Sequence, residues 1–243
     1  MAAFLVGLAK TAIGGLGTIS VALYAAVIPT RESTAALLLS LIVGDLVAVC
    51  AYHRACDWRL IRHLLPGVLP GLVLGTAVLA VADDVTLRRG IGALLLGLLL
   101  LQLWLRHGDR DRDGDGATGQ PDPEPWGLPA KLSAGVGAGF VTMVANAAGA
   151  VMTLYLLGQR VDKLRFLGTS AWFFLCINLA KLPFSTGLGL IHGSMLSTTL
   201  LLSPLVVAGG VLGMRLVRRL QQRSFEVAVL VASAISAGAL LIR

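Results

Sequence analysis

The sequence predicts an all-α integral membrane protein built from two inverted repeats, and three observations carry this prediction. The chain of 243 residues is 56% hydrophobic and 14% charged, with a mean hydropathy of +0.82. A soluble domain of this size cannot bury so much apolar surface. The chain also contains eight apolar segments of about one bilayer crossing each, and residues of its first half recur in the same order in its second half.

The eight apolar segments cover roughly residues 2–29, 33–52, 64–82, 90–105, 130–157, 166–182, 194–214 and 225–242. About 20 apolar residues cross a bilayer core as a helix, because hydrocarbon offers the backbone no other hydrogen-bond partner. None of the segments shows the ten-residue alternation of a membrane barrel. The first segment has no basic stretch before it and no small-residue cleavage site after it, so we expect a membrane segment and not a signal peptide.

The two halves carry matching residues in matching order. At a spacing of 138 positions Pro66, Gly71 and Gly75 recur as Pro204, Gly209 and Gly213, at 131 positions Thr11 and Tyr24 recur as Thr142 and Tyr155, and Thr34 matches Thr169. The repeat predicts three regions: a first membrane repeat over 1–105, a charged flexible linker over 106–128, and a second membrane repeat over 129–243. A duplicated membrane unit is how many transporters form a substrate path between related halves.

Basic residues indicate how the segments are threaded, because Lys and Arg are enriched in cytoplasmic loops. If all eight segments cross the bilayer, nine basic residues fall on one side and ten on the other, which is no bias. If the first segment of each half enters the membrane and returns to its own side, the count is fourteen against five, with Lys10 inside the membrane. The fourteen are Arg54, Arg59, Arg62, Arg106, Arg110, Arg112, Lys131, Arg160, Lys163, Arg165, Arg215, Arg218, Arg219 and Arg223, and the five are Arg31, Arg88, Arg89, Lys181 and Arg243. Each half then crosses three times, so the halves are inverted relative to one another.

Small residues support a break in each first segment. The first half has three glycines in four positions, Gly14, Gly15 and Gly17, each of which weakens a continuous helix by roughly 0.8–1 kcal/mol relative to alanine. The second half has Ala145-Asn146-Ala147-Ala148-Gly149 at the equivalent place, after Gly135, Gly137 and Gly139. Close helix packing is the alternative explanation for these glycines. For the third segments, where glycines recur every four residues at Gly67, Gly71 and Gly75 and at Gly209 and Gly213, we expect close packing.

The sequence predicts no enzyme and no cofactor. It contains no H-E-x-x-H, G-x-S-x-G or P-loop motif. The run Asp109-x-Asp111-x-Asp113-Gly114 resembles the opening of a calcium loop, but Gln120 stands where a bidentate Glu should close it. We therefore predict no metal site and interpret this run as part of a solvated connector.

Asp45, Lys10 and Lys181 are ionisable residues within or at the ends of apolar segments. A charge at the bilayer centre costs about 2.5–3.5 kcal/mol, so such residues usually face a partner or a water-filled path. Aligning the halves by Thr34 and Thr169 brings Asp45 beside Lys181, so the two could approach each other. A structural ion pair, a Lys181 side chain that reaches the interface, and a role in proton coupling or anion attraction are all open readings.

The broken segments are the stronger candidates for a binding site. A helix that restarts within the membrane exposes N–H groups and the positive end of its dipole, which suits an anion. Glycines leave room for backbone approach, threonines and Asn146 offer hydrogen bonds, and Lys10 adds a positive charge. The predicted substrate-binding residues are Lys10, Thr11, Gly14, Gly15, Gly17, Thr18, Thr142, Asn146 and Gly149, with Asp45 and Lys181 as a coupling group or ion pair.

In their order along the chain, these features resemble the sulfite exporter TauE/SafE family. The shared features are the glycine-rich first segment, a second segment that begins at a threonine, Asp57-Trp58-Arg59 before a Pro-Gly-x-x-x-Gly-x-x-x-Gly helix, and a second half with G-x-x-x-G and Asn-Ala-Ala-Gly. The resemblance spans roughly residues 4–242 and implies an inner-membrane permease for sulfite, sulfoacetate or other small, often sulfur-containing anions. The chain departs from the family at Val21-Ala22-Leu23, where the family often has Val-Pro-x-Leu.

The leading hypothesis is a multi-pass transporter of the bacterial inner membrane that exports a small anion, such as sulfite, sulfoacetate or another organosulfonate. Its expected partners are a small inorganic or organic anion and the lipid bilayer. We expect no nucleic acid, although the net charge is +7, because the basic residues cluster in short loops between apolar runs. The alternatives are anion uptake coupled to protons through Asp45, a non-transporting scaffold subunit, and a channel. The sequence leaves the choice of anion and a homodimer open.

Overall fold

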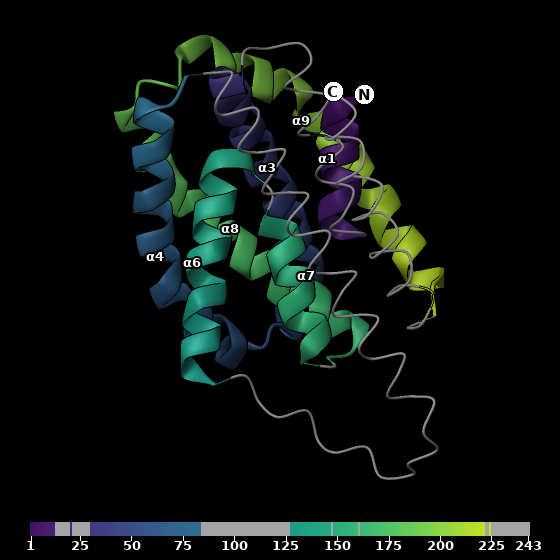
Figure 1. Ribbon diagram of the computed structural model, residues 1–243. Coiled ribbons are helices and arrows are strands. Elements are labelled where there is room, and N and C mark those ends of the chain that lie inside the picture. Colours follow the sequence, from purple (N-terminus) through teal and green to yellow (C-terminus); the bar gives the residue numbers. More distant parts are fainter. Residues whose placement is uncertain are drawn as a thin grey trace.

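The computed structural model describes residues 1–12, 20, 30–83, 127–146, 148–159, 161–221 and 224, and every regular element in these ranges is a helix (Figure 1). The all-α expectation is therefore confirmed for these residues. In chain order the elements are α1 (Ala2–Thr11), α3 (Thr30–Tyr52), the short 3-10 helix η2 (His53–Ala55), α4 (Trp58–Val81), α6 (Leu128–Ala145), α7 (Ala148–Gly158), α8 (Lys163–Gly187) and α9 (Gly193–Arg219).

Four helical stretches in the described ranges are long and apolar enough to cross a membrane: Ala35–Ala55, Trp58–Val81, Lys163–Gly187 and Met195–Arg219. They correspond to four of the eight predicted segments, and the chain is a multi-pass membrane protein. Shorter apolar helices occupy Ala2–Thr11 and Lys131–Ala145, the beginnings of the two predicted broken segments. The predicted segments at 90–105 and 225–242, and residues 106–126 of the linker, lie outside the described residues.

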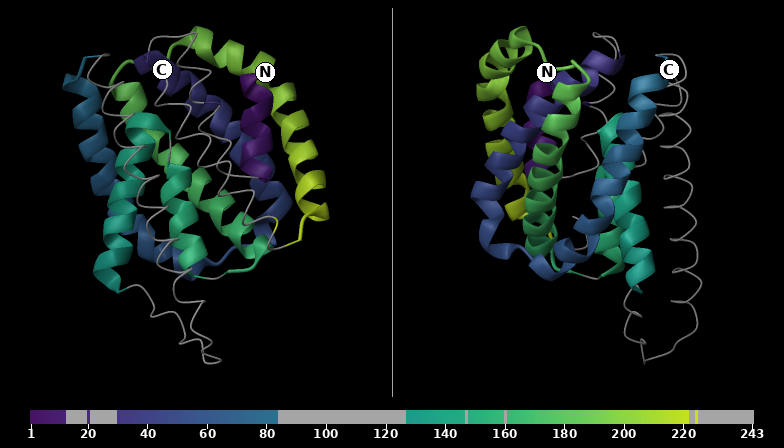
Figure 2. Two further views of the ribbon diagram at one scale, coloured as in Figure 1. Left: turned by 45° about the vertical axis from the view of Figure 1, so that its right-hand side comes forward. Right: turned by 90° about the vertical axis from the view of Figure 1, so that its left-hand side faces the viewer.

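Aspartates fix where two of the long helices begin. The Asp57 carboxylate accepts a hydrogen bond from the Arg59 amide at the start of α4, and the Asp162 carboxylate accepts from the Leu164 and Arg165 amides at the start of α8. Such caps satisfy amides that have no partner within the helix. Figure 2 shows that α9 is bent, and Pro204 within it explains the bend, because proline removes one helical hydrogen bond.

The helices form two outer pairs with a crossing pair between them. On one side α1 lies beside α9, and on the other α4 lies beside α6, while α3 and α8 pass between these pairs (Figures 1 and 2). The first segment of each half therefore packs against the third segment of the other half. The two predicted repeats interlock instead of forming separate bodies.

Glycines allow both outer pairs to approach closely, as their spacing predicts. A methyl group at Gly71 would lie well inside van der Waals contact with the Val136 carbonyl oxygen of α6. In the other pair, a methyl group at Gly209 would meet the Phe4 carbonyl oxygen of α1 in the same way. Both helices thus need a residue without a side chain at the contact, because any Cβ would push the backbones apart.

The contacts within the two outer pairs correspond residue by residue. In the α1·α9 pair, Gly7 lies against the Val206 carbonyl, and in the α4·α6 pair, Gly139 lies against the Val68 carbonyl. The two glycines are 132 positions apart in the sequence, and the two valines are 138 positions apart. The spacing of 138 positions between α4 and α9 thus agrees with the sequence repeat. The first segments match at 132 positions and not at the predicted 131, so packing aligns Thr11 with Met143. The predicted equivalence of Thr11 and Thr142 was therefore wrong by one residue. It was based on matching residue types, whereas the equivalence in the structure depends on which helix face contacts the neighbouring helix.

The first segment of the second half is interrupted where the sequence predicts a break. Helix α6 ends at Ala145, Asn146 adopts a left-handed conformation with φ of 52°, and α7 begins at Ala148. The start of α6 and the end of α7 lie at the same end of the bundle (Figures 1 and 2). The glycines before the break do not interrupt the helix: Gly135 and Gly139 lie inside α6 and contact α4, so for them the packing explanation holds. For the first half, Gly14, Gly15 and Gly17 lie outside the described residues.

Candidate functional site

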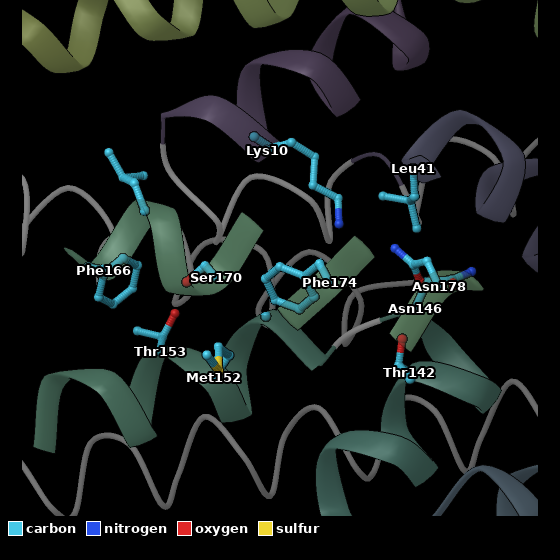
Figure 3. A pocket seen from close by; sticks show the side chains of 13 residues that line it. Lys10, Leu41, Thr142, Asn146, Met152, Thr153, Phe166, Ser170, Phe174 and Asn178 are labelled. Atoms are coloured by element: carbon cyan, nitrogen blue, oxygen red, sulfur yellow. The ribbon is translucent and has the colours of Figure 1, made fainter. Parts of the chain in front are cut away.

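A small cavity lies between the end of α1, the α6–α7 break and one face of α8. Its volume, counted as space in which the centre of a water molecule could lie, is about 50 Å³. The wall consists of Ala9, Lys10, Leu41, Thr142, Asn146, Gly149, Met152, Thr153, Phe166, Leu167, Ser170, Phe174 and Asn178. Figure 3 shows Asn146, Asn178 and Thr142 toward one end of the cavity, and Thr153, Ser170 and Phe166 toward the other. The site therefore joins both predicted halves.

Lys10 is the charged side chain of the cavity wall, and α3 supplies its counter-ion. The Lys10 ammonium lies 2.7 Å from the Asp45 carboxylate, and the two side chains are 12% and 0% exposed. The Asn178 amide donates a hydrogen bond to the other carboxylate oxygen of Asp45, at 2.6 Å. A carboxylate with both partners tolerates burial, because each contact replaces hydration that it lost.

Two neighbours position the Lys10 side chain. Gly44 of α3 leaves space for it, since a methyl group there would come within 3.0 Å of Lys10 Cγ. The Lys10 ammonium also lies 4.3 Å from the centre of the Phe174 ring, a distance at which the negative ring face attracts a cation. Lys10 thus reaches the cavity from α1 and contacts both central helices.

Lys181 lies behind the cavity wall on α8 and contacts the end of α6. Its ammonium donates to the Thr142 carbonyl oxygen at 2.6 Å and to the side-chain oxygen of Asn146. Among the described residues, no carboxylate forms an ion pair with Lys181, which is fully buried. The position suits a cation, because the last carbonyls of a helix have no helical partner and carry the negative end of its dipole.

Asn146 lies at the break between α6 and α7. Its backbone N–H donates to the Thr142 carbonyl at 3.0 Å, which closes the last turn of α6. Asparagine is among the few residues other than glycine that adopt its left-handed conformation readily. Directly after the break, Gly149 of α7 lines the cavity, so the positive end of the α7 dipole adjoins it.

The charged groups at this place are unbalanced. Lys10 lines the cavity, and Asp45 and Lys181 are the buried charged residues behind it in the described part of the chain. When all three are ionised, they carry one net positive charge. Together with the hydroxyl and amide groups of the wall, this arrangement favours an anion over a cation.

The structure brings together some of the predicted site residues and separates others. Lys10, Thr142, Asn146 and Gly149 line one cavity, while Gly14, Gly15, Gly17 and Thr18 lie outside the described residues. Thr11 is not in the cavity wall. Its buried hydroxyl contacts the Gly7 and Gly210 carbonyl oxygens at 3.1 and 2.8 Å and so joins α1 to α9.

Asp45 and Lys181 do not form the pair that the alignment suggested. Asp45 takes Lys10 as its ion partner, because α1 ends beside the middle of α3, whereas Lys181 faces the end of α6. The reading in which Lys181 reaches the membrane interface was also wrong, since its side chain is fully buried. Asp45 thus connects α3 to α1 within the first half, and Lys181 connects α8 to α6 within the second half.

Sequence reasoning missed five polar or aromatic residues of the wall: Thr153, Phe166, Ser170, Phe174 and Asn178. Asn178 carried a usable signal, because a side-chain amide within an apolar run and one helical turn before Lys181 needs a buried partner. Ser170 and Thr153 carried no such signal, since single hydroxyls are common in membrane helices.

Many membrane transporters consist of membrane-spanning helices around a small cavity that lies between two related halves and carries a few polar side chains. The sequence model of the family described as Sulfite exporter TauE/SafE matches residues 1–240, essentially the whole chain, so the protein belongs to that family. Its members are transporters and not enzymes, and the family suggests a membrane transporter for sulfite or a related anion. Neither a search of curated proteins nor one of solved structures finds a match.

Proposed function

We propose that this protein exports a small anion, such as sulfite, sulfoacetate or another organosulfonate, across the bacterial inner membrane, with the cavity between the two halves as its substrate site. The observation that carries the proposal is the cavity with Lys10 in its wall and, behind it, a second buried lysine beside a single buried carboxylate among the described residues. A buried cationic site is unfavourable in a membrane unless something compensates it, and a bound anion does so.

The dimensions and lining of the cavity fit a small oxyanion. One water centre needs roughly 10–15 Å³, so about 50 Å³ accommodates an anion of a few heavy atoms. Lys10 supplies charge, and Asn146, Ser170 and Thr153 supply polar groups that suit anionic oxygens. The aromatic and aliphatic wall residues lower the local dielectric constant, which strengthens each electrostatic contact.

The arrangement of the helices supports inverted halves. The outer pairs α1·α9 and α4·α6 repeat the same contacts, although α1 and α6 begin at opposite ends of the bundle (Figure 1). Two units with equivalent contacts and opposite directions are what alternating access needs, because rocking of one half opens the central site to one side and then to the other. The break at Asn146 gives this motion a hinge beside the site.

Positive charge is concentrated at one end of the bundle, which we assign to the cytoplasm. In the described part of the chain, this end carries Arg54, Arg59, Arg62, Lys131, Lys163, Arg165, Arg215, Arg218 and Arg219. Lys163 joins two helix ends there, because its ammonium donates to the Val217 and Leu220 carbonyls. Basic residues gather on the cytoplasmic side of membrane proteins, which supports placing this end of the bundle in the cytoplasm.

The membrane potential gives export a driving force. An inside-negative potential favours outward movement of a monovalent anion by about 2.3 kcal/mol per 100 mV, without any coupled ion. Uptake needs a coupling ion, and Asp45 is the candidate proton carrier. In this structure Asp45 is fully buried, lies outside the cavity wall and has both Lys10 and Asn178 as partners, so export is the simpler proposal.

Flux of sulfite in proteoliposomes tests the proposal. Vesicles loaded with sulfite and given an inside-negative potential should release it at a rate that saturates with concentration. Asn146→Ala and Ser170→Ala should slow release at least severalfold. Thr76→Val is the matched control, because the Thr76 hydroxyl donates to the Leu72 carbonyl of its own helix at 2.7 Å and Thr76 is not among the residues of the cavity wall. Vesicles that hold folded protein but retain sulfite, sulfoacetate and simple sulfonates would support the scaffold alternative, and release that never saturates would indicate a channel.

A further inference from the structure

Asn178 lines the cavity from α8, and its amide oxygen has no partner among the described residues. The side chain is 1% exposed, and its NH₂ group donates to the Asp45 carboxylate at 2.6 Å. The oxygen is not sealed off either, because the enclosed polar atoms that lack a partner in the described part of the chain belong to other residues. It therefore touches open space, and the open space at Asn178 is the cavity.

Asp45 determines which side of this amide faces the cavity. A carboxylate that is paired with an ammonium group only accepts hydrogen bonds. The amide therefore turns its NH₂ group toward Asp45, which lies outside the wall, and its oxygen away from Asp45. The reverse orientation would place an amide oxygen against a carboxylate oxygen, which is unfavourable because both only accept. Asn178 thus presents an acceptor to a cavity that otherwise suits anions.

The same carboxylate holds a cation and this acceptor next to one another. Lys10 contacts one oxygen of Asp45, Asn178 contacts the other, and both residues line the cavity. The Lys10 ammonium attracts an anionic oxygen, whereas the Asn178 oxygen repels one and accepts only from an O–H or N–H group. A ligand that satisfies both neighbours carries a negative charge and a hydrogen-bond donor close together.

We propose that Asn178 is a specificity-determining residue, which selects anions that carry their own hydrogen-bond donor. Hydrogen sulfite protonated on oxygen and hydroxyalkanesulfonates belong to this class, whereas the sulfite dianion and plain alkanesulfonates have acceptors only. The proton stays on the ligand, so no proton is transferred. This inference rests on the proposed function, because it names the substrate class of the same cavity.

A purely structural role for Asn178 predicts something different. In that case the amide only completes the hydrogen bonds of Asp45, and water in the cavity satisfies its oxygen. Loss of Asn178 would then weaken the binding of every anion by the same factor. The ratio of affinities for two anions of equal charge and similar size separates the two roles, because a general weakening cancels in the ratio.

Hydroxymethanesulfonate and fluoromethanesulfonate are a matched pair of probes, since both are monoanions of similar size and only the first has an O–H group. Each is titrated into purified protein in detergent at a mildly acidic pH, at which hydroxymethanesulfonate stays intact. Wild type should bind hydroxymethanesulfonate roughly fivefold more tightly, as expected for one hydrogen bond between neutral groups. Asn178→Leu, which is similar in size, should bring the two Kd values within about twofold of each other.

Ser170→Ala and Thr76→Val are the control variants. Ser170 lies toward the opposite end of the cavity from Asn178 (Figure 3), so Ser170→Ala should weaken the binding of both probes and preserve their ratio. Thr76 is not among the residues of the wall, so Thr76→Val should preserve both Kd values. A preference for the O–H group that disappears in Ser170→Ala and survives in Asn178→Leu would assign the acceptor to Ser170 and overturn the inference.

The comparison of the two probes in wild type needs no variant. Equal Kd values in wild type overturn the inference while leaving the proposed function standing, and so does a preference that persists without the Asn178 oxygen. If Asn178→Leu does not fold, Asn178→Ala removes the same oxygen without adding bulk and should show the same loss of preference. Failure of wild type to bind either probe or sulfite contradicts the proposed function itself.

Discussion

The buried pair of Lys10 and Asp45 is the residue-level feature with the largest energetic consequence. A charge removed from water is expensive, and the pair survives because Asp45 has Lys10 at 2.7 Å and Asn178 at 2.6 Å. Its stability therefore depends on both partners together. Removal of one partner leaves the other buried and uncompensated.

Asp45→Asn should destabilise the protein by about 3–5 kcal/mol, because it leaves Lys10 as an unpaired cation next to Asn178. Asp45→Asn combined with Lys10→Met should recover much of this loss, since the double variant contains neither charge. Thermal unfolding in detergent measures both effects. A double variant as unstable as the sum of the two single variants would show that the ions contribute independently.

The same carboxylate decides between export and proton-coupled uptake. If Asp45 carries a proton, Asp45→Asn should abolish the response of flux to an imposed pH gradient. Under the export proposal, the pH dependence of the residual flux should match that of wild type. Flux with and without a pH gradient, normalised to folded protein, measures this, with Thr76→Val as the control for reconstitution.

Cys56, between η2 and α4, should react slowly with thiol reagents. Burial raises the pKa of the Cys56 thiol from its ordinary value of 9.0 to about 11, with Asp57 and Cys176 acting in the same direction. A raised thiol pKa lowers the thiolate fraction at neutral pH, and the thiolate is the reactive form. With Cys50 and Cys176 replaced by alanine, the alkylation rate of Cys56 should still be rising above pH 10. A rate that levels off near pH 9 would contradict the burial of this thiol.

At the scale of the elements, the contacts of α6 explain why some of its glycines are required and others are not. A methyl group at Gly139 would overlap the Val68 carbonyl of α4, whereas a methyl group at Gly137 would have nothing within 4 Å. Both glycines lie within the same continuous helix. Sequence spacing does not distinguish them, because the distinction depends on the direction in which each Cα faces α4.

Gly139→Ala should destabilise the protein by about 1–3 kcal/mol, since the added methyl group separates α4 from α6. Gly137→Ala should be neutral or stabilise the protein by up to about 1 kcal/mol, because alanine favours the helix and has open space. Thermal unfolding of the two variants side by side tests this. Equal effects of the two substitutions would mean that α4 and α6 do not pack in this register.

The break between α6 and α7 shows how far local sequence determines an element. Asn146 between short runs of small residues predicts an interruption, and the structure interrupts the helix at this residue. The preceding glycines are equally weak helix formers, yet α6 passes through them, because close contact with α4 compensates for their low helix propensity.

At the scale of the whole molecule, the halves exchange their outer helices. Helix α1 of the first half packs on α9 of the second, and α4 of the first on α6 of the second. The cavity therefore has walls from both halves and does not exist in either alone. Any motion of one half relative to the other changes the cavity directly.

The orientation of the bundle predicts a pattern of accessibility. Single cysteines near Arg62 and Gly127, in a chain without Cys50, Cys56 and Cys176, should react only with reagents that enter the cytoplasm. Cysteines near Arg31 and His192 should react with impermeant reagents from outside, because the ends of the helices place these two pairs at opposite ends of the bundle (Figure 1). Labelling of intact and permeabilised cells measures the pattern. Reagent access to Arg62 and His192 from the same side would refute inverted halves.

The sequence alone determined that this protein lies in a membrane, that it is helical, which family it belongs to, and where the helix breaks at Asn146. Hydrophobicity, repeat spacing and capping residues are local properties, so they can be read along the chain. Only the tertiary structure decided which charges meet. Lys10 pairs with Asp45, Lys181 supports Thr142 and Asn146, and Asn178 joins the site, because ion pairs in a membrane follow from which helix faces lie opposite one another. The repeat places Asp45 and Lys181 near corresponding positions of the two halves, but correspondence along the sequence does not determine which helix lies opposite each side chain, and this is why the repeat predicted the right region and the wrong partners.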